Sequence, residues 1–275
     1  MNQLKIEKKV DLVKGLVEGC SIRSLSRMHD TQKNTITKLL YRVGKGCEKL
    51  LDERMNNLEC KSIQCDEIWT YVGKKQKQLT DNEKKFRLDL GDQYVFVALD
   101  AETKLIPVFQ IGKRSTDTAT KLMLNLEKRL NNRVQITTDA FKGFRDATDI
   151  AFGINTDFAQ LHKTYKSNGE RRYSPPEITA VFNVILSGRP TKGKISTSFV
   201  ERQNLTMRMQ MRRFTRLTNG FSKKFENLKS AVALHFAHYN FCRIHKTLSV
   251  TPAMEAGITK RLWDIKDLLE WEIPY

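Results

Sequence analysis

Apolar side chains recur at helical spacing along the N-terminal segment, and they predict three short helices between residues 4 and 43. Gly19 ends the first helix, and Ser21 is placed to cap the second with its side-chain oxygen. The third helix follows the sequence His29-Asp30-Thr31. The apolar positions that define the three helices are Ile6, Val10, Val13, Val17, Ile22, Leu25, Met28, Ile36, Leu39, Leu40 and Val43.

This layout is typical of a helix-turn-helix domain, in which the N-terminal end of the last helix reaches the edges of DNA bases. A three-helix bundle without a DNA-binding role has the same apolar pattern and stays open as an alternative. Residues 46–60 are expected to form a helical connector, with Gly44 and Gly46 as a weak hinge. Four residues would begin the recognition helix: Gln32, Lys33, Asn34 and Thr35.

From about residue 61 the spacing of apolar residues becomes strand-like. Residues 100–104 have the composition of a hairpin turn, and residues 115–130 predict an amphipathic helix. Three strands in succession, followed by alternating helices and strands, predict an α/β fold with a mixed sheet flanked by helices. The segments expected to form strands are 62–73, 94–99, 105–111, 134–138 and 158–163.

Residues 166–197 interrupt this pattern with several glycines and prolines, although Ile178–Leu186 is apolar enough to pack as a helix. Residues 198–217 predict a strongly basic helix, and residues 221–241 an amphipathic one. The expected domains are residues 1–45 (helix-turn-helix), 46–60 (connector), 61–258 (catalytic, with 166–197 as an insertion) and 259–275 (tail).

The formal net charge is +17, which favours an acidic polymer such as DNA as the partner. No apolar run approaches the roughly 20 residues that span a bilayer, and the first residues do not form a signal peptide, so we expect no membrane association and a cytoplasmic location. The five cysteines lack paired spacing, which indicates reduced thiols rather than disulfides or a zinc site.

Cutting DNA requires carboxylates that hold divalent metal near the scissile phosphate. Asp66 lies inside the first predicted strand, and Asp139 follows the strand at 134–138. Glu201 lies in the first turn of the basic helix. A carboxylate within an apolar strand is costly unless a cation or hydrogen bonds compensate its charge.

Each acid also has a structural explanation. Asp66 could pair with a buried Lys or Arg, and Asp139 could cap the helix that begins near Phe141. Glu201 and Ser198 have the spacing of a capping box. Glu67 is a competing acid, although strand alternation should point it away from Asp66. Spacing alone does not decide between these alternatives.

Three blocks of sequence resemble the catalytic blocks of insertion-sequence-one transposases: Asp66-Glu67-Ile68-Trp69-Thr70-Tyr71-Val72-Gly73, Thr138-Asp139-Ala140-Phe141 and Ser198-Phe199-Val200-Glu201-Arg202-Gln203-Asn204-Leu205. That family belongs to the DDE transposase and retroviral integrase superfamily. The resemblance implies an RNase H-like core in which Asp66, Asp139 and Glu201 are the catalytic metal ligands. It departs from the family in the long interval before Glu201 and in the absence of an N-terminal zinc motif.

The resemblance further implies two Mg²⁺ ions, or Mn²⁺ in their place, and double-stranded DNA as the partner. Metal would activate water to cleave the element ends, and the 3′-hydroxyl would then attack target DNA. Holding two ends requires at least a homodimer on DNA. An insertion-sequence enzyme would be prokaryotic and nucleoid-associated.

Arginines of the basic helix are further candidates for DNA contacts, because guanidinium groups bind phosphate in a bidentate manner. Glu201, Arg208 and Arg212 would share one helical stripe, so Arg208 would grip a phosphate beside the metals. A solvated charged face is the alternative. The arginines expected to contact DNA are Arg202, Arg208, Arg212, Arg213 and Arg216.

The sequence therefore predicts a DDE transposase that cleaves element ends and transfers the 3′-hydroxyl into target DNA. Two alternatives stay open: a nuclease of the same fold without strand transfer, and a DNA-binding regulator derived from a transposase. Neither the terminal repeat nor the target preference follows from the sequence.

Overall fold

The computed structural model describes residues 4–166, 177–215 and 218–274. The N-terminal region contains the three predicted helices, α1 (Ile6–Val17), α2 (Ile22–Met28) and α3 (Lys33–Arg54). Gly19 ends α1 with a φ of 85°, in the left-handed region that glycine tolerates. Ser21 Oγ accepts a hydrogen bond from the Ser24 amide at 2.9 Å, so the cap expected for α2 is present.

The two glycines expected to act as a hinge instead lie inside α3, which continues without a break from Lys33 to Arg54. A side chain at Gly44 would collide with the backbone of Ser230 in α8 (Phe225–Phe241). One at Gly46 would collide with the backbone of Trp271. Glycine is required at both positions because other segments pack directly against the backbone of α3. The pair therefore holds the helix against its neighbours instead of bending it.

The core is a mixed sheet with strand order β3-β2-β1-β4-β5-β6 in the described residues. β1 pairs antiparallel with β2 and parallel with β4, and β4 pairs parallel with β5. This is the mixed, helix-flanked sheet that the resemblance implies, so the predicted fold class is confirmed. The strands are β1 (Ser62–Val72), β2 (Gly91–Asp100), β3 (Val108–Gly112), β4 (Val134–Asp139), β5 (Thr156–Lys166) and β6 (Glu177–Ser187).

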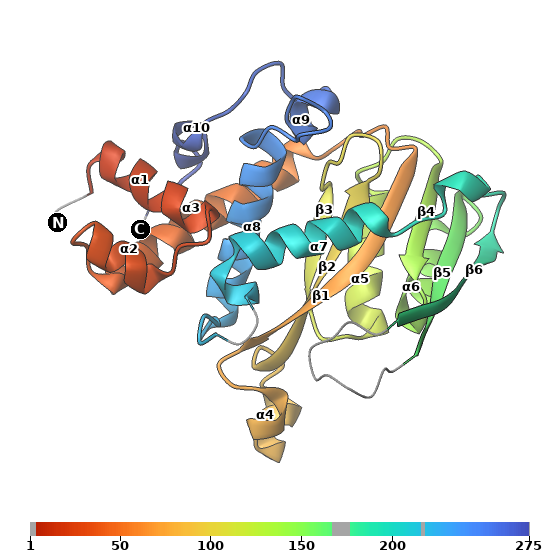
Figure 1. Ribbon diagram of the computed structural model, residues 1–275, viewed down its shortest axis with the longest axis horizontal. Coiled ribbons are helices and arrows are strands. Elements are labelled where there is room, and N and C mark those ends of the chain that lie inside the picture. Colours follow the sequence, from red (N-terminus) through yellow and green to blue (C-terminus); the bar gives the residue numbers. More distant parts are fainter. Residues whose placement is uncertain (1–3, 167–176, 216–217, 275) are drawn as a thin grey trace.

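Helices cover both faces of the sheet (Figure 1). α5 (Thr116–Glu127) and α6 (Lys142–Phe152) lie on one face, and α7 (Ser198–Gln210) crosses the other in front of β1. α8 is apolar around most of its circumference because it packs between α3 and the sheet, where Phe236 contacts Phe109 of β3. α8 is therefore more buried than the amphipathic helix that the sequence predicts.

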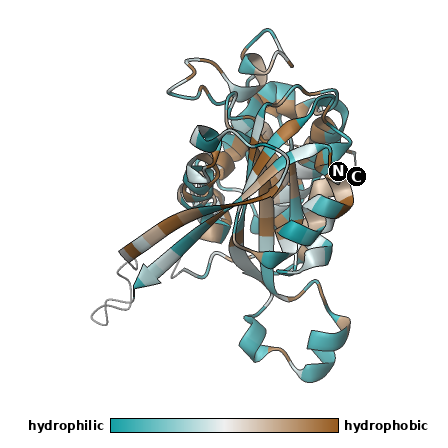
Figure 2. Cartoon of the chain, turned by 90° about the vertical axis from the view of Figure 1, so that its right-hand side faces the viewer, coloured by the Kyte–Doolittle hydropathy of each residue, from teal (hydrophilic) through white to brown (hydrophobic). Residues whose placement is uncertain are grey.

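Two helical predictions were wrong. Ile178–Leu186 lies in strand β6, which fits its enrichment in β-branched residues. The basic helix ends at Gln210 instead of residue 217 and is followed by the short 3₁₀ helix η3 (Arg212–Phe214). Figure 2 shows β5 and β6 projecting from the body of the molecule as a two-stranded ribbon. The polar segment after β1 contains η1 (Gln76–Gln78) and α4 (Asp81–Phe86), and η2 (Lys192–Lys194) precedes α7.

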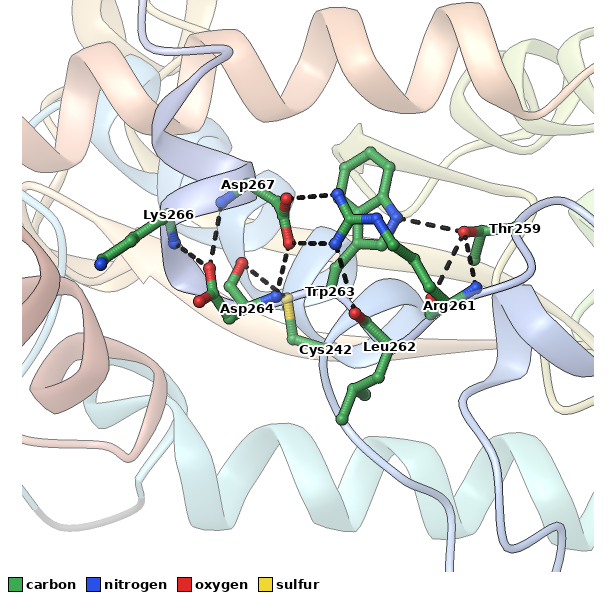
Figure 3. Close-up of polar contacts among 8 residues, drawn as sticks. All are labelled: Cys242, Thr259, Arg261, Leu262, Trp263, Asp264, Lys266 and Asp267. Atoms are coloured by element: carbon green, nitrogen blue, oxygen red, sulfur yellow. Dashed lines mark hydrogen bonds and ion pairs between the residues drawn. The ribbon is translucent and has the colours of Figure 1, made fainter.

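The C-terminal segment contains α9 (Pro252–Glu255) and α10 (Ile265–Leu269) and returns to the end of α8. Figure 3 shows Asp264 and Asp267 in a reciprocal capping box at the start of α10, with Arg261 paired to Asp267. Trp263 packs on Phe241, and its indole donates to Thr259 at 3.2 Å. Among the described helices, none combines the length and apolar character that crossing a bilayer requires.

Candidate metal centre and nucleic-acid interface

Strand register places Asp66 and Asp139 side by side. β1 and β4 are parallel, and their last paired residues are Cys65 and Thr138. Asp66 and Asp139 are the next residue of each strand, so both carboxylates leave the same face where the two strands part. Cys65 is fully buried, as expected for the opposite face. The two acids, which are far apart along the chain, therefore lie together at the end of β4.

Two hydrogen bonds hold the Asp66 carboxylate. Its Oδ1 accepts from the Glu67 amide at 2.9 Å, and its Oδ2 accepts from Asn204 Nδ2 at 2.8 Å. Asn204 lies on α7, one turn after Glu201, and is almost fully buried. These neutral donors satisfy Asp66 without cancelling its charge, which differs from the buried Lys or Arg partner considered above.

A second set of hydrogen bonds aligns α7 with β1. Gln64 lies two residues before Asp66 and therefore on the same face of β1. Its Oε1 accepts hydrogen bonds from the amides of Phe199 and Val200, at 2.9 and 3.2 Å. Amides in the first turn of a helix lack partners within the helix, so this buried side chain supplies one. Sequence reasoning missed both Gln64 and Asn204.

Glu201 lies in the first turn of α7 and is exposed. Its Oε1 accepts from Thr197 Oγ1 at 2.6 Å and pairs with Lys163 of β5. The helix is preceded by Thr197 instead of Ser198, so the capping box considered above does not form. Glu201 is near enough to raise the pKa of both Asp66 and Asp139, but in the described residues the tight acidic cluster comprises Asp66, Asp139 and Glu67.

Glu67 corrects an expectation. Strand alternation should turn it away from Asp66, yet it offers a carboxylate oxygen within 4.8 Å of oxygens of Asp66 and Asp139. The pairing of β1 with β4 ends one residue before Asp66, so the strand edge is open there and a long side chain can reach around it. Glu67 also pairs with Arg114, whose Nε lies 2.6 Å from Oε1.

The three clustered carboxylates oppose one another's ionisation. Burial, followed by the charges of Glu67 and Asp139, raises the pKa of Asp66 from its usual 3.8 to about 7. Burial also raises the pKa of Asp139 and of Glu67, although Arg114 opposes both increases. Hard oxygen ligands in a confined, mutually repelling set are what Mg²⁺ or Mn²⁺ stabilises. The donor set therefore fits a divalent cation.

A groove of about 1170 Å³ lies between the N-terminal helices and residues 212–227. Lys33 and Asn34, at the start of α3, line it, and so does Arg212 of η3. Among its described lining residues, the acidic side chain is Glu226, which pairs with Lys45 at 2.8 Å. The cations that line the groove are Arg23, Lys33, Lys38, Arg42, Arg212, Arg213, Lys223 and Lys224.

The expected DNA-contacting residues occupy different environments. Gln32 and Thr35 begin α3 with Lys33 and Asn34 but do not line the groove. Arg202 is exposed on α7, and Arg208 is half-buried. Arg216 lies outside the described residues.

Arg212 and Arg213 follow the end of α7, so Arg212 does not continue the helical stripe of Glu201 and Arg208. Arg212 is exposed to the groove. Arg213 instead donates from Nε to Ser222 Oγ at 2.7 Å, and burial lowers the pKa of its guanidinium to about 10. These contacts favour a structural role for Arg213.

Comparison with known proteins yields matches to solved structures alone: no protein-family model matches the chain, and no curated protein matches it significantly. The structural matches include Mos1 transposase complexes. A Mos1 transposase paired-end complex with left transposon end is 14% identical, with 57% of this chain and 60% of that chain covered and a TM-score of 0.23. The Mos1 strand transfer complex is also 14% identical, with 57% of this chain and 59% of that chain covered and a TM-score of 0.23.

A third structure, the Mos1 mariner paired end complex with Mn, is 14% identical over 54% of this chain and 56% of that chain, with a TM-score of 0.22. The chain thus spans less than two thirds of the Mos1 chains. Similarity this low carries no information on activity, so the function proposed below depends on the acidic cluster and the basic groove.

Proposed function

We propose that this chain is a DDE-type transposase that cleaves the ends of an insertion element and joins the freed 3′-hydroxyl to target DNA. The observation that carries the proposal is the convergence of Asp66 and Asp139 at the end of β4, with Glu201 close enough to act on both through its charge. Asp66 and Asp139 come from distant parts of the sequence, and the basic residues that follow the end of α7 line a separate groove, which supports the arrangement that the family resemblance implies.

Each side chain has a distinct role in this proposal. Asp66 and Asp139 hold the metal, and Asn204 keeps the Asp66 carboxylate turned toward Asp139. Glu201, which pairs with Lys163, would be the third ligand, and Lys163 would lie close enough to this site to bind a DNA phosphate. When bound, two Mg²⁺ or Mn²⁺ ions would activate the attacking oxygen and neutralise charge at the phosphate.

The basic groove provides a path for the element end. Lys33 and Asn34 contact DNA from the start of α3, and Arg212, Lys223 and Lys224 bind its phosphates from the opposite wall. Arg202 and Arg208 on α7 lie on the helix that leads from this groove toward Glu201. A dimer would hold two such ends for strand transfer.

Glu201→Gln tests the proposal. Glutamine still accepts the hydrogen bond from Thr197 but is a poor metal ligand, so thermal stability and DNA binding persist while strand transfer falls at least about a hundredfold. The matched control is Glu102→Gln, because Glu102 is also a partly exposed glutamate paired with a lysine, Lys194. Strand transfer at the wild-type rate in Glu201→Gln would return this glutamate to a structural role.

The assay also separates the two enzyme classes. A labelled element end and a supercoiled target plasmid are incubated with Mg²⁺, and cleaved and joined products are resolved on one gel. A transposase yields both products. Cleavage without joining under these conditions identifies a nuclease, and DNA binding without either product identifies a regulator.

A further inference from the structure

Two buried oxygen atoms beside the acidic cluster have no hydrogen-bond partner. One is Oε2 of Glu67, whose side chain is 5% exposed, and the other is Oδ1 of Asn204, which is 8% exposed as a residue. A buried acceptor without a partner costs the full desolvation free energy of that group, and the cost is larger when the group is charged. Both unpaired oxygens lie where a hard cation could act as the missing partner.

Of these two residues, Glu67 is the stronger candidate for a metal ligand, because it carries a charge and already lies within the cluster. Its carboxylate oxygen is within 4.8 Å of one oxygen of Asp66 and one of Asp139. Oxygens bound to opposite sides of one divalent ion are separated by about 4–5 Å, since each lies about 2.0–2.6 Å from the metal. The three carboxylates are thus already spaced as a ligand set.

Arg114 fixes Glu67 without saturating it. The guanidinium binds Oε1 through Nε at 2.6 Å, and it stacks on the ring of Phe141 with its centre 4.4 Å from the ring centroid. Phe141 follows Asp139 in the turn before α6, so the same turn positions Asp139 and buttresses Arg114. One oxygen of Glu67 is held by the arginine, and the other stays buried and unpaired.

We propose that Glu67 is a fourth carboxylate of the cation site, binding a divalent metal together with Asp66 and Asp139. The inference rests on the proposed function and adds a ligand that the three-acid arrangement does not include. A bound cation gives Glu67 Oε2 its missing partner. It also explains why a negative side chain is buried beside two others.

Metal binding without DNA tests the inference directly. Mn²⁺ affinity is measured by the loss of the free-ion electron paramagnetic resonance signal, and thermal unfolding is followed with and without Mn²⁺. Glu67→Gln keeps the size of the side chain and the hydrogen bond to Arg114 and should weaken Mn²⁺ binding about tenfold or more. The Mn²⁺-induced rise in Tm shrinks in parallel. Asp66→Asn is the positive control, and Glu102→Gln the matched control that binds as wild type does.

A second variant gives an effect of opposite sign. Arg114→Gln removes a positive charge that competes with the metal for Glu67 and Asp139, so Mn²⁺ affinity should increase about threefold or more. An unchanged affinity in both Glu67→Gln and Arg114→Gln, with Asp66→Asn weakened, would overturn the role of Glu67 and leave the proposed function intact. Wild-type affinity in Asp66→Asn would instead count against the metal site of the proposed function.

The metal-free protein provides a further distinction. If Glu67 is a ligand, the cluster repels itself without metal, and Glu67→Gln does not lower the Tm of the metal-free protein. If Glu67 serves to pair with Arg114, the same change lowers that Tm and leaves the Mn²⁺-induced rise unaltered. The second pattern would refute the inference.

Discussion

At the scale of single residues, the decisive quantity is the protonation state of Asp66. Its carboxylate is held by neutral donors, from Asn204 and the Glu67 amide, which fix its direction and leave its charge in place. Burial and its acidic neighbours then raise the pKa of Asp66 to about 7. Near neutral pH the residue is therefore divided between a protonated form and a form ready to bind a cation.

This shift predicts a pH-dependent stability of the metal-free protein. The pKa of Asp66 is about 7 in the folded protein against 3.8 ordinarily, so the folded state binds a proton that the unfolded state has lost between these values. Ionisation of Asp66 therefore removes stability as pH rises from about 4 to 7 and removes none below that window. The Asp66→Asn variant has no carboxylate to ionise at this position. As pH rises from about 4 to 7, its Tm should therefore increase relative to that of wild type by at least about 3 °C.

The measurement is the difference in Tm between the two proteins from pH 4 to pH 8, without metal. Groups away from the acidic cluster titrate equally in both proteins and cancel; for example, burial lowers the pKa of His235 to about 3, which costs stability at acid pH in either protein. A difference in Tm that stays constant with pH would show that Asp66 ionises normally.

How much of the site could be predicted from the sequence depends on the type of contact. Asp66 and Asp139 were candidates because each ends or interrupts an apolar strand, a pattern that lies within a few residues of sequence, but the family resemblance was needed to choose them among the competing acids. Asn204 and Gln64 could not be identified, because their partners are more than a hundred positions away and neither changes the local pattern. Glu67 was misplaced because alternation describes where a side chain leaves the strand and not how far it extends; β1 is still paired with β2 at Glu67, but its edge toward β4 is open there.

At the scale of elements, small residues decide how closely helices approach. α3 packs on α8 with Gly44 against the backbone of Ser230, so the contact excludes even a methyl group. The sequence showed two glycines in a helical segment and suggested a hinge, since local composition does not reveal what packs against them. The same limitation affected Ile178–Leu186, whose apolar run is compatible with either a helix or a strand until its neighbour β5 is known.

Gly44→Ala should therefore destabilise the protein. The new methyl group must displace backbone atoms of Ser230, and overpacking of this kind costs about 1–3 kcal/mol. Chemical denaturation measures the free energy of unfolding. Gly193→Ala is the control, because a side chain there meets no atom within 4 Å and should alter stability little. Equal effects of the two substitutions would mean that α3 and α8 can separate at low cost.

At the scale of the whole molecule, two segments distant in sequence meet at a groove that is rich in positive charge. The start of α3 and residues 212–227 line one groove, in which cations greatly outnumber acids among the described residues. The net charge predicted a polyanionic partner from composition alone. The location of the basic groove could not be predicted, because it depends on how the N-terminal helices pack against residues 212–227.

The groove predicts a specific salt dependence of DNA binding. Lys223→Ala with Lys224→Ala should lower the slope of log affinity against log salt by about 0.9–1.8, because each phosphate contact contributes about 0.9. Fluorescence anisotropy of a labelled duplex between low and moderate salt measures this slope. Lys84→Ala with Lys85→Ala, on α4 and away from the groove lining, is the matched control. If the two double variants gave the same slope, DNA would not follow the groove.

The unbroken course of α3 has a geometric consequence. Its 22 residues make a rod of about 33 Å, close to one turn of B-form DNA. Arg129 clamps the far end through the Leu51 and Met55 carbonyls, at 3.1 and 3.0 Å. The packing of Gly44 and Gly46 also holds the middle of the helix, so one residue added between this packed region and the start of α3 would rotate the leading tip by about 100°. The direction in which Lys33 and Asn34 face the groove therefore depends on how the rest of the helix packs.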